Sequence, residues 1–436
     1  MLMNTMRKDI LVTGFALFSM FFGAGSVIFP VYLGMGAANQ WFLGFNLFFW
    51  IDIGIALLAI FAMLLRHSDV EGVMRPLGRI PSVIMISAVI LCIGPLLAIP
   101  RTGATVYEMA VVPIFGEGGL VLTSIIYFFI ILLLTIKESS IVDILGKFLT
   151  PALFVGLMVL IIKGLISPIG PIAEQPLMDN VIEQGMIAGY QAMDVLAALA
   201  FGVLIVRIVE GKGYTSYSDK MRVIGLSSIL GATGLFVIYC GVTYLGATGS
   251  SLFTLEINQG QLLVQIINML LGHSGGILLG IVIALACATT AVALAGASAA
   301  YFSRLSGGRV SYKAIVVIVC VFSALMSNIG LSAIISFAAP ILSIVYPGAL
   351  VMIFLTFFHK RIKNDNIYRF ATSAAVIVSA LEVFQSMGAP TDFIRLLPLS
   401  NYGFGWVVPS VIVGFVGAFI KADSTEEQLQ EAHQPD

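Results

Sequence analysis

The chain has 436 residues, of which 59% are hydrophobic and 10% are charged, and its mean hydropathy is +1.04. Soluble globular domains carry about 25% charged residues, so this composition excludes an ordinary soluble domain. The formal net charge of −1, without a basic patch, gives no support to a nucleic-acid partner.

Apolar stretches of about 20 residues or more follow one another along the chain, and each is long enough for a membrane-spanning helix. We predict twelve, at residues 10–36, 40–64, 80–110, 119–136, 144–166, 186–210, 222–248, 276–303, 312–330, 331–358, 367–388 and 402–420. The fold class is therefore an all-α polytopic membrane protein. Its single transmembrane domain covers residues 10–420, between an N-terminus at 1–9 and an acidic tail at 421–436 that we expect to be disordered.

The loops between these stretches distribute Lys and Arg unevenly. With twelve spans, all but three of the 22 basic residues lie on one side of the membrane; the exceptions are Arg101, Lys163 and Arg395. Basic loops favour the cytoplasmic side, so we predict that both termini are cytoplasmic. On the other side, QLLVQIINMLLG (261–272) has helical spacing but is too short to span. We expect it to lie over the outer face, either as a lid or as a plain interfacial helix.

The first apolar stretch contains MFFGAGSVIFP (20–30), in which Gly23, Ala24, Gly25 and Ser26 are consecutive and Pro30 follows. Small residues tolerate non-helical backbone angles, and Pro30 lacks the N–H that a continuous helix needs. A broken helix survives in a membrane only where it lines a cavity inside the protein. The alternative is a close contact between two intact helices, which small residues also favour.

A second interrupted stretch, AGYQAMDVLAALAFG (188–202), occurs five spans later and contains Asp194. Paired irregular helices at corresponding positions are typical of transporters built from inverted repeats. We therefore predict a five-plus-five arrangement with broken helices 1 and 6. The first repeat covers about 10–166 and the second about 186–358, and two extra helices cover about 367–420.

Polar and charged residues inside the other apolar stretches are further candidates, because burying them in lipid is costly. Thr289 and Thr290 lie in LACATTAVALAGASAAYF (285–302); their hydroxyls either bond back to the preceding turn or bind a hard cation. Asp194 can cap a helix break, bind a cationic group or carry a proton. We expect Asp52 to lie at the outer membrane interface. Arg101 is expected either to pair with Glu108 or to close the outer vestibule. Glu382 is expected to contribute to packing or to an oligomer contact.

Several of these segments resemble one family, the branched-chain amino-acid:cation symporters known as bacterial system II carriers. FFGAGSVIFP (21–30) resembles the family's FFGAGNxIFP, and similar segments follow in matching order: GPLLAIPRTGATVYE (94–108), GYQAMDVLAALAFG (189–202) and ACATTAV (286–292). The family shares the fold of the sodium-coupled leucine transporter. The resemblance implies inward transport of leucine, isoleucine and valine, with methionine as a further candidate, across a bacterial inner membrane.

The resemblance also implies roles for individual residues. The substrate carboxylate would meet the amides of Gly23, Ala24, Gly25 and Ser26. The second break, within Asp194 to Ala200, would offer carbonyls to the ammonium, and its apolar residues Val195, Ala198 and Leu199 would line the side-chain pocket. Sodium would be held by the carbonyls of Ser19, Phe22 and Ala286 and the hydroxyls of Thr289 and Thr290. Ser26 replaces the family's Asn, so one sodium ion is expected rather than two.

Other functions remain as alternatives. Coupling to protons would keep the same fold and make Asp194 a proton carrier. The sequence has no paired His or His–Asp set within a span and no GxSxG motif, so no catalytic residue is predicted, and sodium is the only cofactor expected. The sequence also lacks the repeated filter motif of many channels. The oligomeric state is not predicted.

Overall fold

The computed structural model describes residues 2–23, 25–66, 70–136, 141–214 and 216–420, and these residues form helices and connecting loops without a strand. The predicted tail at 421–436 and the predicted binding residue Ala24 lie outside this described part. Helices are expected throughout, because a helix satisfies all its backbone polar groups within one segment that crosses lipid.

The helices fall into three runs along the chain. The first run is α1 (Leu2–Phe21), α2 (Gly25–Ala37), α3 (Trp41–Phe49), α4 (Ile55–Leu65), α5 (Val70–Met74), α6 (Arg79–Leu91), α7 (Ala98–Val106), α8 (Val112–Phe115), α9 (Leu120–Ile136) and α10 (Ile141–Ile166). The second run is α11 (Val181–Ala192), α12 (Asp194–Gly211), α13 (Tyr217–Thr248), α14 (Gln259–Leu305), α15 (Tyr312–Ser327) and α16 (Leu331–Phe357). The third run is α17 (Asn366–Ser386) and α18 (Val407–Gly417).

Every predicted apolar stretch is occupied by one or more of these helices. Among the described residues, seven helical stretches are long and apolar enough to cross a membrane, and four shorter apolar helices accompany them. The all-helical membrane architecture is therefore confirmed, whereas the number of twelve crossings and the inverted repeat stay predictions.

Both predicted helix breaks are present. The first separates α1 from α2 and begins after Phe21. The second was predicted within Asp194 to Ala200, but it lies one residue earlier, at Met193, whose φ of 69° and ψ of 13° are left-handed. Such angles turn the chain out of one helix and into the next. Asp194 is consequently the first residue of α12 rather than part of the interruption.

Three further irregularities are visible in the structure. A π-helical turn at Trp50–Gly54 joins α3 to α4 and contains Asp52. Another at Cys92–Leu96 interrupts the third apolar stretch before α7, with Pro95 inside it. The helix predicted over the outer face forms the start of α14 and bends away at Gly272, where φ is 72°. Its apolar residues Leu262, Leu263 and Ile266 are fully buried, so it packs on the protein.

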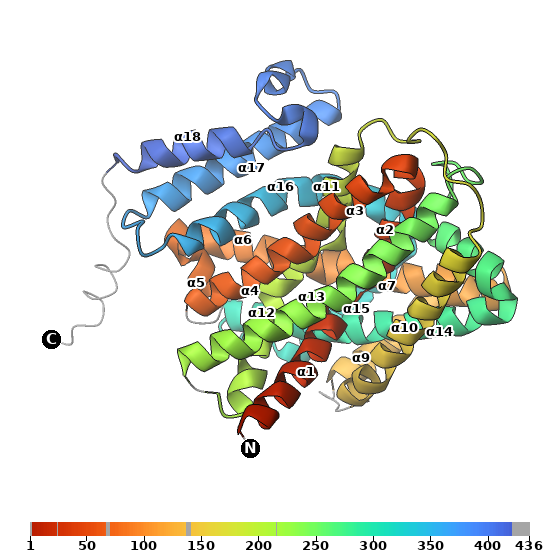
Figure 1. Ribbon diagram of the computed structural model, residues 1–436. Coiled ribbons are helices and arrows are strands. Elements are labelled where there is room, and N and C mark those ends of the chain that lie inside the picture. Colours follow the sequence, from red (N-terminus) through yellow and green to blue (C-terminus); the bar gives the residue numbers. More distant parts are fainter. Residues whose placement is uncertain (1, 24, 67–69, 137–140, 215, 421–436) are drawn as a thin grey trace.

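The helices around the functional region pack in two groups. The first group contains α1–α4 and α11–α13: α13 runs along α1 and α2, α12 along α4, and α11 along α3. The second group contains α6–α9, α14 and α15, with α14 packed on α7, α9 and α15. Helices α17 and α18 lie side by side at one edge of the molecule, beyond α16 (Figure 1). The first group carries both helix breaks, and the second faces them.

Candidate functional site

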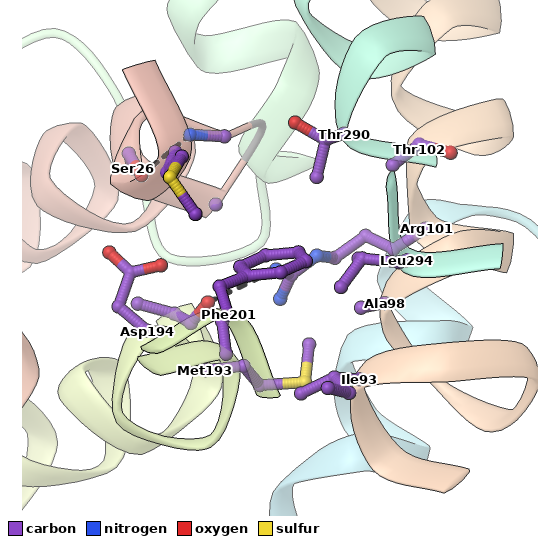
Figure 2. A pocket seen from close by; sticks show the side chains of 15 residues that line it. Ser26, Ile93, Ala98, Arg101, Thr102, Met193, Asp194, Phe201, Thr290 and Leu294 are labelled. Carbon is purple, nitrogen blue, oxygen red and sulfur yellow. Dashed lines mark hydrogen bonds between the residues drawn. The ribbon is translucent and has the colours of Figure 1, made fainter. Parts of the chain in front are cut away.

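A cavity lies where the two groups meet, and the space between its lining atoms, including its open part, is about 470 Å³. The first group contributes both helix breaks to the wall, and the second contributes α7 and α14 (Figure 2). The polar part of the wall includes Gly23, Gly25, Ser26, Arg101, Thr102, Asp194 and Thr290. The apolar part includes Met20, Ile93, Ala98, Ala197, Phe201 and Leu294.

Ser26 shapes the first break through its hydroxyl group. The amide of Gly23 donates to Ser26 Oγ at 3.1 Å, and Ser26 Oγ donates to the carbonyl of Phe21 at 3.0 Å. The amide of Ser26 in turn donates to Gly23 O at 3.2 Å. Because that amide would bond to Phe22 O in a regular α-helix, the Phe22 carbonyl loses its helical partner. Two of the amides predicted to hold a carboxylate are therefore already used within the break.

Asp52 stabilises the second break from a distant part of the chain. Its Oδ1 accepts a hydrogen bond from the amide of Asp194 at 3.3 Å, and this amide is the first of α12. The exposed fraction of Asp52 is 0%, so the predicted outer-interface position is wrong. A carboxylate at a helix N-terminus satisfies an unpaired donor and interacts favourably with the helix dipole. The capping considered for Asp194 is thus supplied by Asp52.

Arg101 reaches from α7 across the cavity to the end of α11 (Figure 2). Its Nη1 donates to Gln191 O at 2.5 Å and its Nη2 to Ala192 O at 3.5 Å. The predicted pair with Glu108 is wrong, since Glu108 Oε1 accepts from Asn258 Nδ2 at 3.0 Å instead. The carbonyls at the end of α11, just before the second break, therefore hold the guanidinium group of Arg101, whereas the carbonyls predicted to receive a substrate ammonium lie later, within Asp194 to Ala200.

Opposite charges face this region without being paired. Asp194 and Arg101 are 7% and 6% exposed, and both line the cavity. Within the described part of the chain, Asp52 Oδ2, Asp194 Oδ2 and Arg101 Nε are buried without a hydrogen-bond partner. The ion pairs found among the described residues join Lys212 to Asp9 and Lys220 to Glu210, away from the cavity. Buried charges are costly unless they are compensated, so the arrangement favours a ligand that carries charges of both signs.

The apolar residues of α12 divide between two faces of the helix. Asp194, Ala197 and Phe201 line the cavity, and their spacing of three and four residues places them on one face. The predicted pocket residues Val195, Ala198 and Leu199 are fully buried but are not part of the wall. They lie on the other faces of α12, packed in the core. The helix thus lines the cavity with a different face from the one predicted, and its contact with a substrate stays a prediction.

The predicted sodium residues come together only in part. Thr290 of α14 lines the cavity, and a Cβ placed at Gly23 would lie 4.0 Å from both its Oγ1 and its Cγ2, so its side chain faces the first break. Thr289 Oγ1 donates to Ala286 O at 2.9 Å, which leaves its lone pairs available to a cation. Phe22 and Ala286 are buried but do not line the cavity, and Ser19 lies in the last turn of α1. Hydroxyl and carbonyl oxygens are suitable ligands for a hard cation.

Arg101 and Asp52 contact the second helix break in the structure, a role that the sequence did not predict for either residue. Both carried a signal, because each is a charged residue within an apolar stretch, yet each was expected to have a structural role near the membrane surface. Met20, Ile93, Ala98 and Leu294 carried no signal, since an apolar residue on an apolar helix looks the same wherever it points.

Comparisons with known proteins show which family the chain resembles. A family model described as "Branched-chain amino acid transport protein" matches residues 6–424. The branched-chain amino acid permease BraB of Bacillus subtilis is 34% identical over 423 residues, 94% of this chain and 95% of the relative. The branched-chain amino acid transport system 2 carrier protein of Pseudomonas aeruginosa is 35% identical over 410 residues, 92% and 93% of the two chains.

Solved structures share the fold. Mhp1, a nucleobase-cation-symport-1 family transporter in a closed conformation with bromovinylhydantoin bound, superimposes with a TM-score of 0.63 at 15% identity, over 95% of this chain and 96% of Mhp1. A Na+-coupled sialic acid symporter in a substrate-bound outward-open state gives a TM-score of 0.62 at 15% identity, over 95% and 90% of the two chains. At this level of identity the likeness concerns the fold alone.

Proposed function

Because the chain belongs to the family of branched-chain amino acid transport proteins, we propose that it is a secondary active symporter that takes up leucine, isoleucine and valine together with sodium. It is a membrane transport protein and not an enzyme. Methionine is a candidate fourth substrate, because an unbranched apolar side chain can fill the same kind of pocket.

The division of the cavity wall into a charged part and an apolar part is the observation that carries this proposal. Arg101 and Asp194 supply opposite charges for the zwitterionic end of an amino acid. Ile93, Ala197, Phe201 and Leu294 supply a wall without hydrogen-bonding side chains for an aliphatic side chain. Since one methylene group changes binding in such a pocket by about 1–3 kcal/mol, we expect several aliphatic amino acids to be accepted.

Sodium coupling is supported by the oxygen atoms between the first break and α14. The Thr290 side chain faces the break, Thr289 Oγ1 lies one residue earlier, and the Phe22 carbonyl has lost its helical donor. These atoms come from the two different helix groups. A cation held between them would tie the groups together, and its release would let them move, as alternating access requires.

Proton coupling is the second candidate, and Asp52 and Asp194 favour it. Each has a buried Oδ2 without a hydrogen-bond partner in the described structure, and the two residues meet at the second break. Neighbouring buried carboxylates readily share a proton, because two like charges cannot both be ionised at low cost.

Uptake of labelled isoleucine into proteoliposomes distinguishes these possibilities. We expect concentrative uptake under an imposed inward sodium gradient and none under a proton gradient without sodium. Uptake under the proton gradient alone would contradict sodium coupling and would make Asp194 and Asp52 the next residues to substitute. Absence of concentrative uptake under both gradients would contradict the proposed substrate class.

A further inference from the structure

The substrate's carboxylate is a charged group for which the structure offers a different partner from the amides of the first break. Two of those amides, of Gly23 and Ser26, already donate within the break. We infer that Arg101 is the residue that binds the substrate carboxylate, and that Asp194 receives the ammonium group. This inference rests on the proposed function, because it specifies how an amino acid lies in the cavity.

The guanidinium group of Arg101 has donors left for an anion. A guanidinium carries five N–H groups, and two hydrogen bonds lead to the carbonyls of Gln191 and Ala192. The buried Nε has no hydrogen-bond partner in the described structure. Arg101 is therefore held at the end of α11 while part of its planar fork still faces the cavity. A carboxylate matches that fork, since it can accept two parallel hydrogen bonds from one guanidinium.

The position of the guanidinium group concentrates positive charge at one place in the wall. A Cβ at Gly25 would lie only 2.8 Å from Arg101 Nη2, so the guanidinium packs directly against the first residue of α2. The N-terminus of a helix carries a partial positive charge. The Cζ of Arg101 also lies 5.1 Å from the centroid of the Phe29 ring of α2, whose face attracts a cation. An anion at this point would be stabilised by the arginine and the helix end together.

The ammonium group has a separate partner. The α11 carbonyls are used by Arg101, whereas Asp194 Oδ2 is buried, unpartnered in the described structure and part of the cavity wall. Arg101 enters from α7 and Asp194 from the start of α12 (Figure 2). The two charges are thus presented by different helix groups. A zwitterion between them would connect both groups, whereas a molecule with one charge would leave the other uncompensated.

Binding of leucine and of leucinamide to the purified full-length protein tests this assignment. Leucinamide keeps the ammonium group and the side chain but lacks the carboxylate charge. The dissociation constants are measured by calorimetry in lipid nanodiscs with saturating sodium chloride. We expect the wild type to prefer leucine by about 10- to 150-fold, the range for hydrogen bonds to charged groups. In Arg101→Gln the preference should fall to roughly threefold or less, mainly through weaker leucine binding.

Two variants complete the experiment. Arg101→Lys keeps a positive charge without the planar guanidinium group, so its preference for leucine over leucinamide should lie between those of the wild type and Arg101→Gln. If Arg101→Gln does not fold, Arg101→Lys replaces it in the test. Arg395→Gln, at an exposed position outside the cavity, should keep the wild-type preference. If Arg101→Gln, or Arg101→Lys in its place, weakened leucine and leucinamide equally or neither of them, Arg101 would not be the carboxylate partner. If the wild type bound no leucine, the proposed function itself would be contradicted.

Discussion

Of the five residues predicted to hold sodium, Thr290 is the one that lines the cavity in the described structure. Its side chain faces Gly23 from the opposite helix group, whereas the hydroxyl of Thr289 donates to the carbonyl of Ala286. A threonine on a helix most often satisfies itself on the preceding turn, as Thr233 does by donating to Ile229 O at 2.7 Å. The two threonines Thr290 and Thr233 therefore offer a matched comparison.

Thr290→Val should raise the sodium concentration needed for half-maximal isoleucine uptake about tenfold, because it removes one ion–dipole contact of roughly 1.5 kcal/mol without changing the side-chain shape. Thr233→Val, at an exposed position on α13, should leave that concentration unchanged. The measurement is initial uptake in proteoliposomes at a series of sodium concentrations. Equal sodium dependence of both variants would remove Thr290 from the ion site.

Asp52 shows how one residue can determine the geometry of a distant helix break. The carboxylate on the Trp50–Gly54 turn caps α12, which begins more than 140 positions later in the chain. Asp52→Asn keeps an oxygen acceptor at this position, whereas Asp52→Val removes it at similar volume. Both variants lose the negative charge, so the difference between them isolates the cap.

We expect Asp52→Val to be less stable than Asp52→Asn by about 1 kcal/mol, the usual contribution of an N-terminal cap. Thermal melting of the two purified variants in the same detergent measures this difference. Indistinguishable melting temperatures would mean that the hydrogen bond from the Asp194 amide contributes nothing to the break.

At the scale of whole elements, α2 and α13 approach one another more closely than side chains would allow. Cβ atoms at Gly34 and Gly246 would collide with the backbone carbonyls of Thr243 and Val31, respectively. Each glycine thus faces the main chain of the other helix. Small residues at such crossings increase van der Waals contact where the hydrophobic effect cannot drive helices together.

Gly246→Ala should destabilise the protein by about 1–3 kcal/mol, because a rigid carbonyl group cannot move aside as a side chain could. Gly211→Ala is a suitable control: it lies at the end of α12, and a Cβ there would meet nothing within 4 Å. The fraction of protein that stays monodisperse after heating in detergent reports the effect. An unchanged melting profile for Gly246→Ala would show that the crossing relaxes without cost.

For the molecule as a whole, the distribution of Lys and Arg predicts that both termini face the cytoplasm. We therefore expect a reporter that fluoresces only in the cytoplasm to be active when fused to either terminus in bacterial cells. An epitope inserted after Glu256, in the connection between α13 and α14, should be labelled from outside the inner membrane. Opposite signals from the two termini would require an odd number of crossings.

Much of the architecture follows from local patterns in the sequence. Long apolar stretches fix where helices lie, because the backbone in lipid must form its own hydrogen bonds. Consecutive small residues before Pro30 located the first break, and the polar interruption around Asp194 located the second to within one residue. Thr290 could be singled out because a hydroxyl group in a run of Ala and Cys is conspicuous. These features depend on neighbours in the chain, so the sequence by itself determined them.

The composition of the cavity wall was decided by the tertiary structure. Ala197 and Phe201 line it rather than Val195, Ala198 and Leu199, because the rotation of α12 depends on its packing against α4. Arg101 and Asp52 belong to this region only because α7 and the turn at Trp50–Gly54 are brought against the two breaks. The crossing angle of two helices and the rotation of each about its axis follow from packing between segments far apart in the chain. Local residue patterns do not specify that geometry.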